Sequence, residues 1–319
     1  MDGSGAWSDM HTVLAGGVGA ARYLRGALET LDPSTVTAVV NVADDVVLHG
    51  LHVSPDLDTC TYTLAGAIDP TRGWGLVDES WQAMAELGRY GDHNWFSLGD
   101  RDLGTHLFRT SQLLQGVTLT DVTAAITEAW GLKCCLLPVT DDRVETRVII
   151  EGGVEITFQE YFVRLAHDVS IEAVSFHGAE NACPTKAALS AISDAECVVI
   201  APSNPIVSIG PILAIPGVRE AVEIRRLRNV AVSPIVGGTA LKGPADRMLR
   251  ELGGESSVVG VARLYRDLAA TLVIDEVDAA LAPAVEQAGM NAVVMPTIMS
   301  EPGVAASLAA RCHQMGSKG

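Results

Sequence analysis

Short runs of apolar residues recur along the chain, and most of them lead into a stretch whose apolar positions follow a helical period. Such runs are typical of strands buried in a parallel sheet, because helices cover both faces of these strands. The pattern therefore predicts an α/β fold. The predicted strands are residues 11–15, 36–42, 169–176, 197–201, 229–236, 272–274 and 292–295. Helices are expected near residues 24–31, through 61 and 64, twice between 74 and 109, and at 184–192, 245–252 and 302–313.

The period of the pattern changes in the middle of the chain. A helical stretch at residues 118–130 precedes two alternating runs, 146–150 and 154–163, joined by Glu151-Gly152-Gly153. Alternating runs on either side of a glycine turn are typical of a β-hairpin. We therefore expect an inserted smaller subdomain, containing this hairpin, at about residues 115–170.

Composition agrees with a globular protein that has one large core. The chain has 319 residues, of which 48% are hydrophobic, so it can bury a sizeable core. We expect a single domain over residues 10–315. Residues 1–9 contain Gly and Ser without periodicity and are expected to form a disordered extension.

Charge and cysteine content narrow the range of partners. The net charge of −17 argues against nucleic-acid or anionic-membrane binding, because both need clustered basic residues. The one short basic run, residues 225–228, is expected to end a helix. No apolar run reaches the roughly 20 residues of a membrane helix, and the N-terminus lacks signal-peptide features. The six cysteines form no Cys-x-x-Cys pair and are expected to be reduced, in a cytoplasmic protein.

A glycine loop follows the first predicted strand. Gly16, Gly17 and Gly19 lie between residues 11–15 and a helical pattern. Glycines at such a turn let the backbone approach an anion and point helix N–H groups at it. A dehydrogenase fingerprint would need a third glycine where Arg22 stands, so ordinary dinucleotide binding is not favoured.

Four aspartates gather after the second predicted strand. Asp44 and Asp45 come where residues 36–42 would end, and Asp56 and Asp58 follow a Ser-Pro turn, with no Lys or Arg between them. Carboxylates crowded in this way repel one another unless a cation offsets their charge, and magnesium prefers oxygen ligands. The pattern therefore favours a metal or phosphate site. A helix cap with exposed turn aspartates is the alternative.

Polar residues follow two later predicted strands. These loops contribute Ser203, Asn204 and Pro205 in one case, and Ser233 and Gly237 in the other. At the carboxyl ends of a parallel sheet, such loops would contact the other end of a nucleotide. A tight prolyl turn that caps a helix would give the same pattern at Ser203–Pro205, so both interpretations stay open.

Further polar residues have two interpretations each. Asp100 and Asp102 flank Arg101, which suits a helix start with local salt bridges or a contact from Arg101 to phosphate or substrate. His49 lies near the aspartates and could contact a substrate. No histidine has the spacing of a zinc site, and no Gly-x-Ser-x-Gly motif of a hydrolase is present.

Taken in order, these motifs resemble the 2-phospho-L-lactate transferase family of deazaflavin coenzyme F-420 biosynthesis, in particular its actinobacterial members. The resemblance covers nearly the whole chain. Ala20 departs from it, because members often carry glycine there. The matching motifs are Ala-Gly-Gly-Val-Gly (15–19), Val-Ala-Asp-Asp (42–45), His-Gly-Leu (49–51), Pro-Asp-Leu-Asp-Thr (55–59), Leu-Gly-Asp-Arg-Asp (98–102), Phe-Gln-Glu (158–160), Ala-Pro-Ser-Asn-Pro (201–205) and Ser-Pro-Ile (233–235).

The resemblance implies a Rossmann-like parallel-sheet core with an inserted region, in a homodimer that uses magnesium. It implies transfer of a phosphoenolpyruvyl or 2-phospholactyl group from a guanosine diphosphate-linked donor. The acceptor would be the terminal ribityl hydroxyl of the deazaflavin Fo, and GMP would be released. Negative charge develops when an alkoxide attacks a diphosphate, and magnesium held by aspartates would neutralise it.

The resemblance also assigns roles to the residues singled out above. We expect the Fo ring near residues 45–57 and 95–101, and the diphosphate of GDP on the glycine loop, with guanine preferred over adenine. The expected metal ligands are Asp44, Asp45 and Asp58. The expected catalytic residues are Asp45, Asp58 and Arg101. The expected substrate contacts are His49, Asp56, Asp100, Gly16, Gly17, Gly19, Ser203, Asn204, Pro205, Ser233 and Gly237.

A second class of protein shares some of these motifs. Nucleotide-sugar-binding regulators of the same superfamily carry a similar glycine loop and paired aspartates, followed by a run rich in glycine and serine. This chain instead has Val-Val-Leu-His-Gly at residues 46–50 and then Pro-Asp-Leu-Asp. The sequence therefore favours the transferase, and a thermal shift with Fo rather than with UDP-sugars would separate the two classes.

Overall fold

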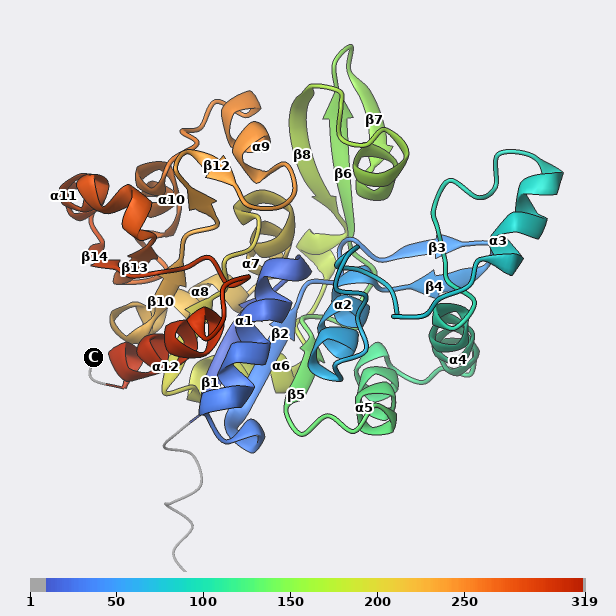
Figure 1. Ribbon diagram of the computed structural model, residues 1–319, viewed down its shortest axis with the longest axis horizontal. Coiled ribbons are helices and arrows are strands. Elements are labelled where there is room, and N and C mark those ends of the chain that lie inside the picture. Colours follow the sequence, from blue (N-terminus) through green and yellow to red (C-terminus); the bar gives the residue numbers. More distant parts are fainter. Residues whose placement is uncertain (1–9, 318–319) are drawn as a thin grey trace, which may run out of the picture.

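The computed structural model describes residues 10–317, so the extension predicted at residues 1–9 lies outside the described residues. A seven-stranded sheet forms the centre of the protein, and all its neighbouring strands are parallel, as the sequence predicted (Figure 1). Its strand order is β14-β13-β10-β9-β1-β2-β5. The strands are β1 (His11–Ala15), β2 (Val36–Val40), β5 (Cys135–Pro138), β9 (Cys197–Ile200), β10 (Val230–Val232), β13 (Thr271–Ile274) and β14 (Asn291–Val294).

The chain adds strands first on one side of β1 and then on the other, so the strand order reverses at β1. Strands β2 and β5 lie on one side of it, and β9, β10, β13 and β14 lie on the other. Every residue of β1, β2, β9 and β10 is buried, since helices cover both faces of the sheet. Each fully buried Val, Leu or Ile contributes about 1.5–3 kcal/mol. In open α/β sheets, ligands bind at the carboxyl ends of the strands beside such a reversal.

The helices of the described part of the chain are α1 (Gly17–Thr30), α2 (Pro55–Leu64), α3 (Gln82–Leu87), α4 (Asp102–Leu114), α5 (Leu119–Ala129), α6 (Lys186–Asp194), α7 (Gly210–Ala214), α8 (Val218–Ile224), α9 (Ala245–Glu251), α10 (Val258–Tyr265), α11 (Ala282–Gln287) and α12 (Val304–Gly316). Helices α12, α1 and α2 lie side by side over one face of the sheet, and α6 and α8 cover the other (Figure 1). Helices α1 and α12 approach closely because Gly26 has no side chain. A Cβ on Gly26 would lie 2.3 Å from the carbonyl carbon of Ala305.

The sequence pattern predicted the longer helices but not all the short ones. The helices expected at residues 118–130, 184–192, 245–252 and 302–313 correspond to α5, α6, α9 and α12. Arg225–Arg228 follow α8, as expected for a basic helix end. Helices α7, α10 and α11 were not predicted, because five to eight residues hold too little of the helical period.

The hairpin predicted around the Glu151 turn is present and has a third strand. Strand β6 (Glu145–Ile150) pairs antiparallel with β7 (Val154–Thr157) and with β8 (Ile171–His177). The prediction that residues 169–176 belong to the parallel sheet was therefore wrong. Most of β8 is only partly buried, as is typical of a strand with one face outside the core. Strand β7 ends before the predicted residue 163 because a π-helical segment, Glu160–Arg164, follows it.

The insertion expected at about residues 115–170 includes parts of the main core. Strand β5 lies inside that range and forms the edge of the parallel sheet, whereas the whole of β8 lies after its end. Figure 1 shows the β6–β7–β8 sheet standing apart from the parallel sheet. The division of the chain at these boundaries stays a prediction.

Two short hairpins were not predicted. Strands β3 (Val46–Leu48) and β4 (Leu51–Val53) flank a turn at His49 and Gly50, which have φ values of 52° and 80°. This hairpin and α3 extend to one side of the sheet around their own apolar cluster (Figure 1). The run predicted as one strand at 229–236 is divided between β10 and β11 (Ile235–Val236), which pairs with β12 (Thr239–Ala240). A His-Gly turn is not a strong hairpin signal, so β3 and β4 had no cue.

Within the described residues, no single helix has the length and apolar content needed to cross a membrane, although the bent pair Pro205–Ala214 and Val218–Ile224 meets both criteria together. The cysteines are free thiols, as predicted. Cys60, Cys134, Cys197 and Cys312 are buried, whereas Cys135 and Cys183 are exposed.

Candidate active site

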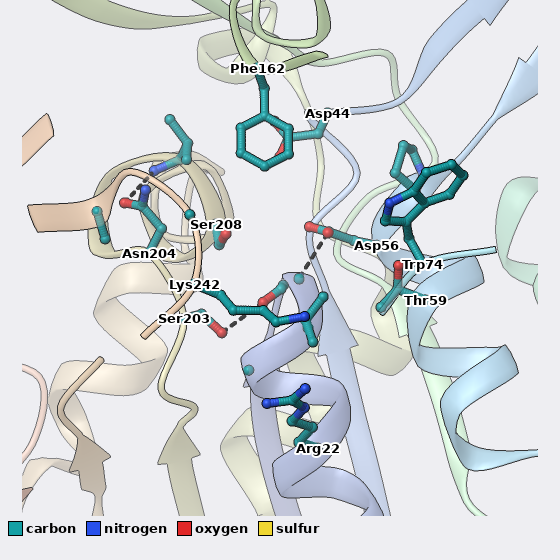
Figure 2. A pocket seen from close by; sticks show the side chains of 18 of the residues that line it. Arg22, Asp44, Asp56, Thr59, Trp74, Phe162, Ser203, Asn204, Ser208 and Lys242 are labelled. Atoms are coloured by element: carbon teal, nitrogen blue, oxygen red, sulfur yellow. Dashed lines mark hydrogen bonds between the residues drawn. The ribbon is translucent and has the colours of Figure 1, made fainter. Parts of the chain in front are cut away.

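A cavity of about 860 Å³ lies where the carboxyl ends of the central strands meet. The loops that follow β1, β2, β9, β10 and β14 all contribute to its lining. Figure 2 shows lining side chains such as Asp44, Asp56 and Ser203 around the start of α1. The lining comes from segments 16–22, 44, 53–62, 72–75, 96–106, 158–163, 202–208, 233–234, 241–245 and 297–300.

The glycine loop joins β1 to α1, as the pattern predicted, and it lines the cavity at the start of α1. Gly17 has a φ of 69°, which favours glycine, and its N–H donates a 2.8 Å hydrogen bond to Oδ1 of Asp56. Gly19 lies against the loop after β9, because a Cβ there would be 2.1 Å from the carbonyl oxygen of Pro202. Gly16 also lines the cavity. The loop therefore brings backbone close to the cavity, although the Gly17 N–H already has a carboxylate partner.

Four carboxylates line the cavity, those of Asp44, Asp56, Asp58 and Asp102, and Figure 2 shows Asp44 and Asp56. Asp56 accepts a second hydrogen bond, 3.0 Å from Nδ2 of Asn41, and burial raises its pKa to about 6. Among the described residues, the buried Oδ1 of Asp44 has no hydrogen-bond partner. Burial and the charge of Asp56 raise the pKa of Asp44 well above its usual range. A divalent cation would offset this charge, so these two carboxylates suit a hard metal ion.

Asp45 does not line the cavity. Its Oδ2 accepts a 2.6 Å hydrogen bond from Ser54 and lies 2.9 Å from Nε2 of His52. The paired aspartates of the sequence motif therefore have different surroundings. Asp44 lies with Asp56 at the cavity, whereas Asp45 contacts the side chain of His52 in β4.

Asp58 is held in a buried ion pair with Arg109 of α4. The guanidinium donates to both carboxylate oxygens, and the Nη1–Oδ2 distance is 3.1 Å. Nδ1 of His106 lies 3.7 Å from Asp58, and its Nε2 lies 3.2 Å from Asp102. Asp58, Asp102 and His106 have the spacing of a possible metal site. Because Arg109 already provides the counter-charge of Asp58 and would repel a divalent cation, Asp44 and Asp56 are better placed as metal ligands.

The loop after β9 caps a helical segment, as one interpretation of its sequence predicted, and it also lines the cavity. Ser203 donates a 2.7 Å hydrogen bond to the carbonyl oxygen of Gly16, which ties this loop to the glycine loop. Oδ1 of Asn204 accepts the N–H of Ile206 at 2.9 Å and caps the π-helical segment Pro205–Ile209. Ser203 and Asn204 also line the cavity, whereas Pro205 does not.

Of the two residues predicted after β10, one reaches the cavity. Ser233 is buried in the lining, and its Oγ donates a 2.9 Å hydrogen bond to the carbonyl oxygen of Ile235. Gly237 lies outside the lining and donates its N–H to Oδ2 of Asp278 at 2.9 Å.

Besides Asp45, Pro205 and Gly237, three more predicted site residues lie outside the cavity lining. Asp100 holds the start of α3, where it accepts a 2.5 Å hydrogen bond from Ser80. Arg101 is exposed and donates to the carbonyl oxygen of Val77 at 2.5 Å. His49 is exposed in the β3–β4 turn. The structure therefore separates these residues from Asp44 and Asp56.

Several cavity residues were missed by the sequence reasoning. Arg22 and Lys242 add positive charge, and Trp74, Phe158 and Phe162 add aromatic surface. The rings of Phe158 and Phe162 are stacked with centres 5.4 Å apart. Arg22 could have been found, because it follows Gly19 by three positions and so shares its helix face. Phe158 lies in the Phe-Gln-Glu motif at residues 158–160, although no site role was predicted for it. Trp74, Phe162 and Lys242 come from segments remote in sequence, and no local pattern marked them.

A sequence profile of the family described as 2-phospho-L-lactate transferase CofD matches residues 12–306. The chain belongs to this family. The protein named phosphoenolpyruvate transferase in Mycobacterium avium (strain 104) is 43% identical over 322 residues, which cover 93% of this chain and 96% of that protein. The protein of the same name in Mycobacterium tuberculosis (strain ATCC 25618 / H37Rv) is 43% identical over 316 residues, with the same coverage. The chain is thus an enzyme, as the sequence predicted, rather than a regulator.

Two solved structures have the same fold as this chain. Two crystal structures of a Bacillus halodurans protein, one described as a member of the UPF0052 family, match with TM-scores of 0.62 and 0.63. They cover 96% and 95% of this chain and 99% of that protein, at 18% sequence identity. At this identity the similarity concerns the fold alone, and it confirms the predicted α/β core.

Proposed function

We propose that this enzyme moves a phosphoenolpyruvyl group from a guanosine diphosphate-linked donor to the terminal ribityl hydroxyl of Fo and releases GMP. The names of the two mycobacterial relatives support phosphoenolpyruvyl over the 2-phospholactyl group. The observation that carries the proposal is the pair Asp44 and Asp56 beside the glycine loop. The cavity extends on both sides of this pair. Carboxylates at a phosphate loop suit a reaction that must neutralise charge on a diphosphate.

The donor fits the side of the cavity formed by the loops after β1, β9 and β10. Gly16 and Gly19 present backbone there, and Ser203, Asn204 and Ser233 present polar side chains. This side lies at the reversal of the sheet, where nucleotides bind in open α/β folds. We therefore place the diphosphate on the glycine loop and the guanosine toward Asn204 and Ser233.

The acceptor fits the opposite side, formed by α2 and the loops near Trp74 and Phe96. Thr59 and Tyr62 of α2 line this side together with both aromatic residues. Flat rings bind well between aromatic side chains with a few polar groups nearby. The Fo ring would then lie beside Trp74 and Phe96, with the ribityl chain directed to Asp56. Phe96 lies within residues 95–101, where the sequence analysis expected the ring, whereas Thr59, Tyr62 and Trp74 lie outside both expected ranges.

Magnesium fits Asp44 and Asp56 as its protein ligands. Both side chains offer carboxylate oxygens to the cavity, and Oδ1 of Asp44 lacks a hydrogen-bond partner among the described residues. When bound, magnesium would supply positive charge to the diphosphate oxygens. In the transfer, the ribityl oxygen loses its proton and bonds to the phosphorus that carries the acid. The bridging P–O bond breaks, and its electron pair leaves with GMP.

The test is product formation by the purified full-length protein. We expect Fo and the phosphoenolpyruvyl donor to yield GMP and a product with the mass of Fo plus the transferred group, faster than with the 2-phospholactyl donor. In thermal shifts, Fo and GDP should stabilise the protein, and GDP more than ADP. Absence of product with both donors, together with stabilisation by UDP-sugars alone, would refute the proposal.

A pair of aspartate variants tests the placement of magnesium. Asp56→Asn keeps the size of the side chain but removes its charge, so turnover should fall about a hundredfold to a thousandfold, a loss of roughly 3–4 kcal/mol. Asp45→Asn is the matched control, because Asp45 lies outside the cavity lining. Magnesium titrations of GMP release, beside melting curves, would measure both. Equal losses in the two variants would contradict the assignment of Asp56.

A further inference from the structure

Two basic side chains reach the cavity from segments far apart in sequence. Arg22 projects from the second turn of α1, and Lys242 comes from the turn that follows β12. Figure 2 shows Lys242 extending across the start of α1, with Arg22 further along the same helix. Both positive charges therefore face the same part of the cavity. This part lies next to α1, on the side of the glycine loop away from Asp44 and Asp56.

Neither cation has an acidic partner in the part of the chain that the structure describes, residues 10–317. By contrast, Arg72, which also lines the cavity, pairs with Asp69, and Arg109 pairs with Asp58. Arg22 and Lys242 instead repel each other, since burial and the charge of Arg22 lower the pKa of Lys242. Holding like charges together costs free energy, which a bound anion would offset.

Lys242 is also held in place by the opposite wall of the cavity. A Cβ built on Gly73 would lie 2.6 Å from Nζ of Lys242, so the ammonium group packs directly against this glycine. Gly73 belongs to a compact loop whose ends are joined by backbone bonds between Asp69 and Gly75. The long side chain therefore spans the cavity between two loops rather than extending into solvent.

We propose that Arg22 and Lys242 form a two-cation clamp for an oxyanion of the donor, which is either the phosphate of the leaving nucleotide or the carboxylate of the transferred acid. This inference rests on the proposed function. The donor carries a diphosphate and a carboxylate, and its anions cannot all lie against Asp44 and Asp56. The planar guanidinium of Arg22 can bind two oxygens at once, and Lys242 adds a point charge from the other side.

Binding of the separate anions tests the clamp without relying on turnover. We would measure the affinities of GDP and of phosphoenolpyruvate by calorimetry, using Arg22→Gln and Lys242→Gln. Loss of a charged hydrogen bond should weaken binding of the anion that the clamp holds by about 10- to 100-fold. The charge-retaining variant Lys242→Arg should keep most of the affinity, whereas Arg22→Lys should keep only part of it, because an ammonium group cannot bind two oxygens in a fork. Matched controls are Arg25→Gln on the exposed face of α1 and Lys186→Gln at the start of α6, which should change it less than twofold.

The anion that loses affinity identifies the source of the oxyanion. Weaker GDP binding alone assigns the clamp to the nucleotide phosphate, and weaker phosphoenolpyruvate binding alone assigns it to the transferred acid. Unchanged affinity for both anions, or no binding of either by the wild-type protein, would overturn the clamp. The proposed function fails separately, when the wild-type protein makes no product from Fo while the anion affinities still fall in the variants.

Discussion

The four aspartates within residues 44–58 have three different surroundings. Asp44 and Asp56 line the cavity, Asp45 contacts His52 and Ser54 outside it, and Asp58 lines the cavity but is paired with Arg109. Their chemistry follows from these partners rather than from their spacing in sequence. A carboxylate with a guanidinium on both oxygens has little capacity left for a metal, whereas an unpaired one has nearly all of it.

The Asp58–Arg109 pair should matter for stability. In Asp58→Asn, the buried guanidinium loses its counter-charge, so the free energy of unfolding should fall by about 3–5 kcal/mol. Urea denaturation would measure this loss. Replacing both partners, as Asp58→Asn with Arg109→Met, should recover part of it, because no unpaired charge then remains buried.

An exposed ion pair provides the control for that experiment. Asp246→Asn breaks a pair with Arg250, whose side chain is largely exposed, and should cost at most about 1 kcal/mol. If Asp58→Asn were no more destabilising than this control, the buried pair would not hold α2 to α4 as the structure suggests.

At the scale of elements, helix α1 is fixed in place by contacts that need glycine. Gly19 faces the loop after β9, and Gly26 faces α12. Both contacts involve backbone, which cannot move aside as a flexible side chain would. Helix α1 can therefore lie this close to the loop after β9, on the donor side of the cavity, only because Gly19 has no side chain.

Gly19→Ala tests this contact. The new Cβ would lie 2.1 Å from the carbonyl oxygen of Pro202, so α1 or the β9 loop must shift. We expect a loss of about 1–3 kcal/mol in stability and weaker GDP binding, measured by denaturation and calorimetry. Gly104→Ala in α4 is the control, since nothing lies within 4 Å of its Cβ position, and it should be neutral or stabilising by about 1 kcal/mol. Equal effects of the two substitutions would contradict the proposed tight contact.

The elements that the sequence predicted well are those whose pattern is local. Strands β1, β2 and β9 are continuous apolar runs, and α5 and α12 span three or more helical turns. Strand β8 was assigned to the wrong sheet, because an apolar run identifies a strand but not its partner. Strands β3 and β4 have three residues each and a His-Gly turn, so neither period nor turn chemistry marked them.

The same limit applies to the candidate site at the scale of the whole molecule. The glycine loop, Asp44, Asp56 and Ser203 follow predicted strands, so topology alone brought them together. Arg109, Lys242 and Phe162 reach the site from α4, from the turn after β12 and from the π-helical segment after β7. These side chains reach the site only because the peripheral elements pack on the sheet in a particular way. The pattern of a single segment does not predict that packing.

The contact between the two ends of the described chain depends on an uncharged histidine. His11 of β1 is fully buried, with Nε2 3.1 Å from the hydroxyl of Tyr23, and its ring meets His313 of α12 at 5.4 Å between centres. Burial, together with His313, lowers the pKa of His11 from 6.5 to about 3. Protonation of His11 therefore opposes the docking of α12.

This shift makes stability depend on pH. Below pH 6.5 the unfolded chain binds a proton that folded His11 does not take up until about pH 3, so the free energy of unfolding falls as pH falls. From pH 7 to pH 5 this group alone should remove about 2 kcal/mol. Urea denaturation at both pH values should show a smaller loss in His11→Gln, but not in His177→Gln, whose side chain is half exposed. Parallel pH curves for wild type and His11→Gln would be inconsistent with this origin.

The close contact between Gly26 and Ala305 also has a consequence for biosynthesis. These positions are separated by nearly 280 residues, and a ribosome that adds about 5–20 residues per second needs roughly 15–55 seconds to make that segment. During this time the apolar face of α1 that later receives α12 has no cover from its own chain. Until α12 has been made, the nascent polypeptide therefore exposes this apolar surface, which a chaperone can bind.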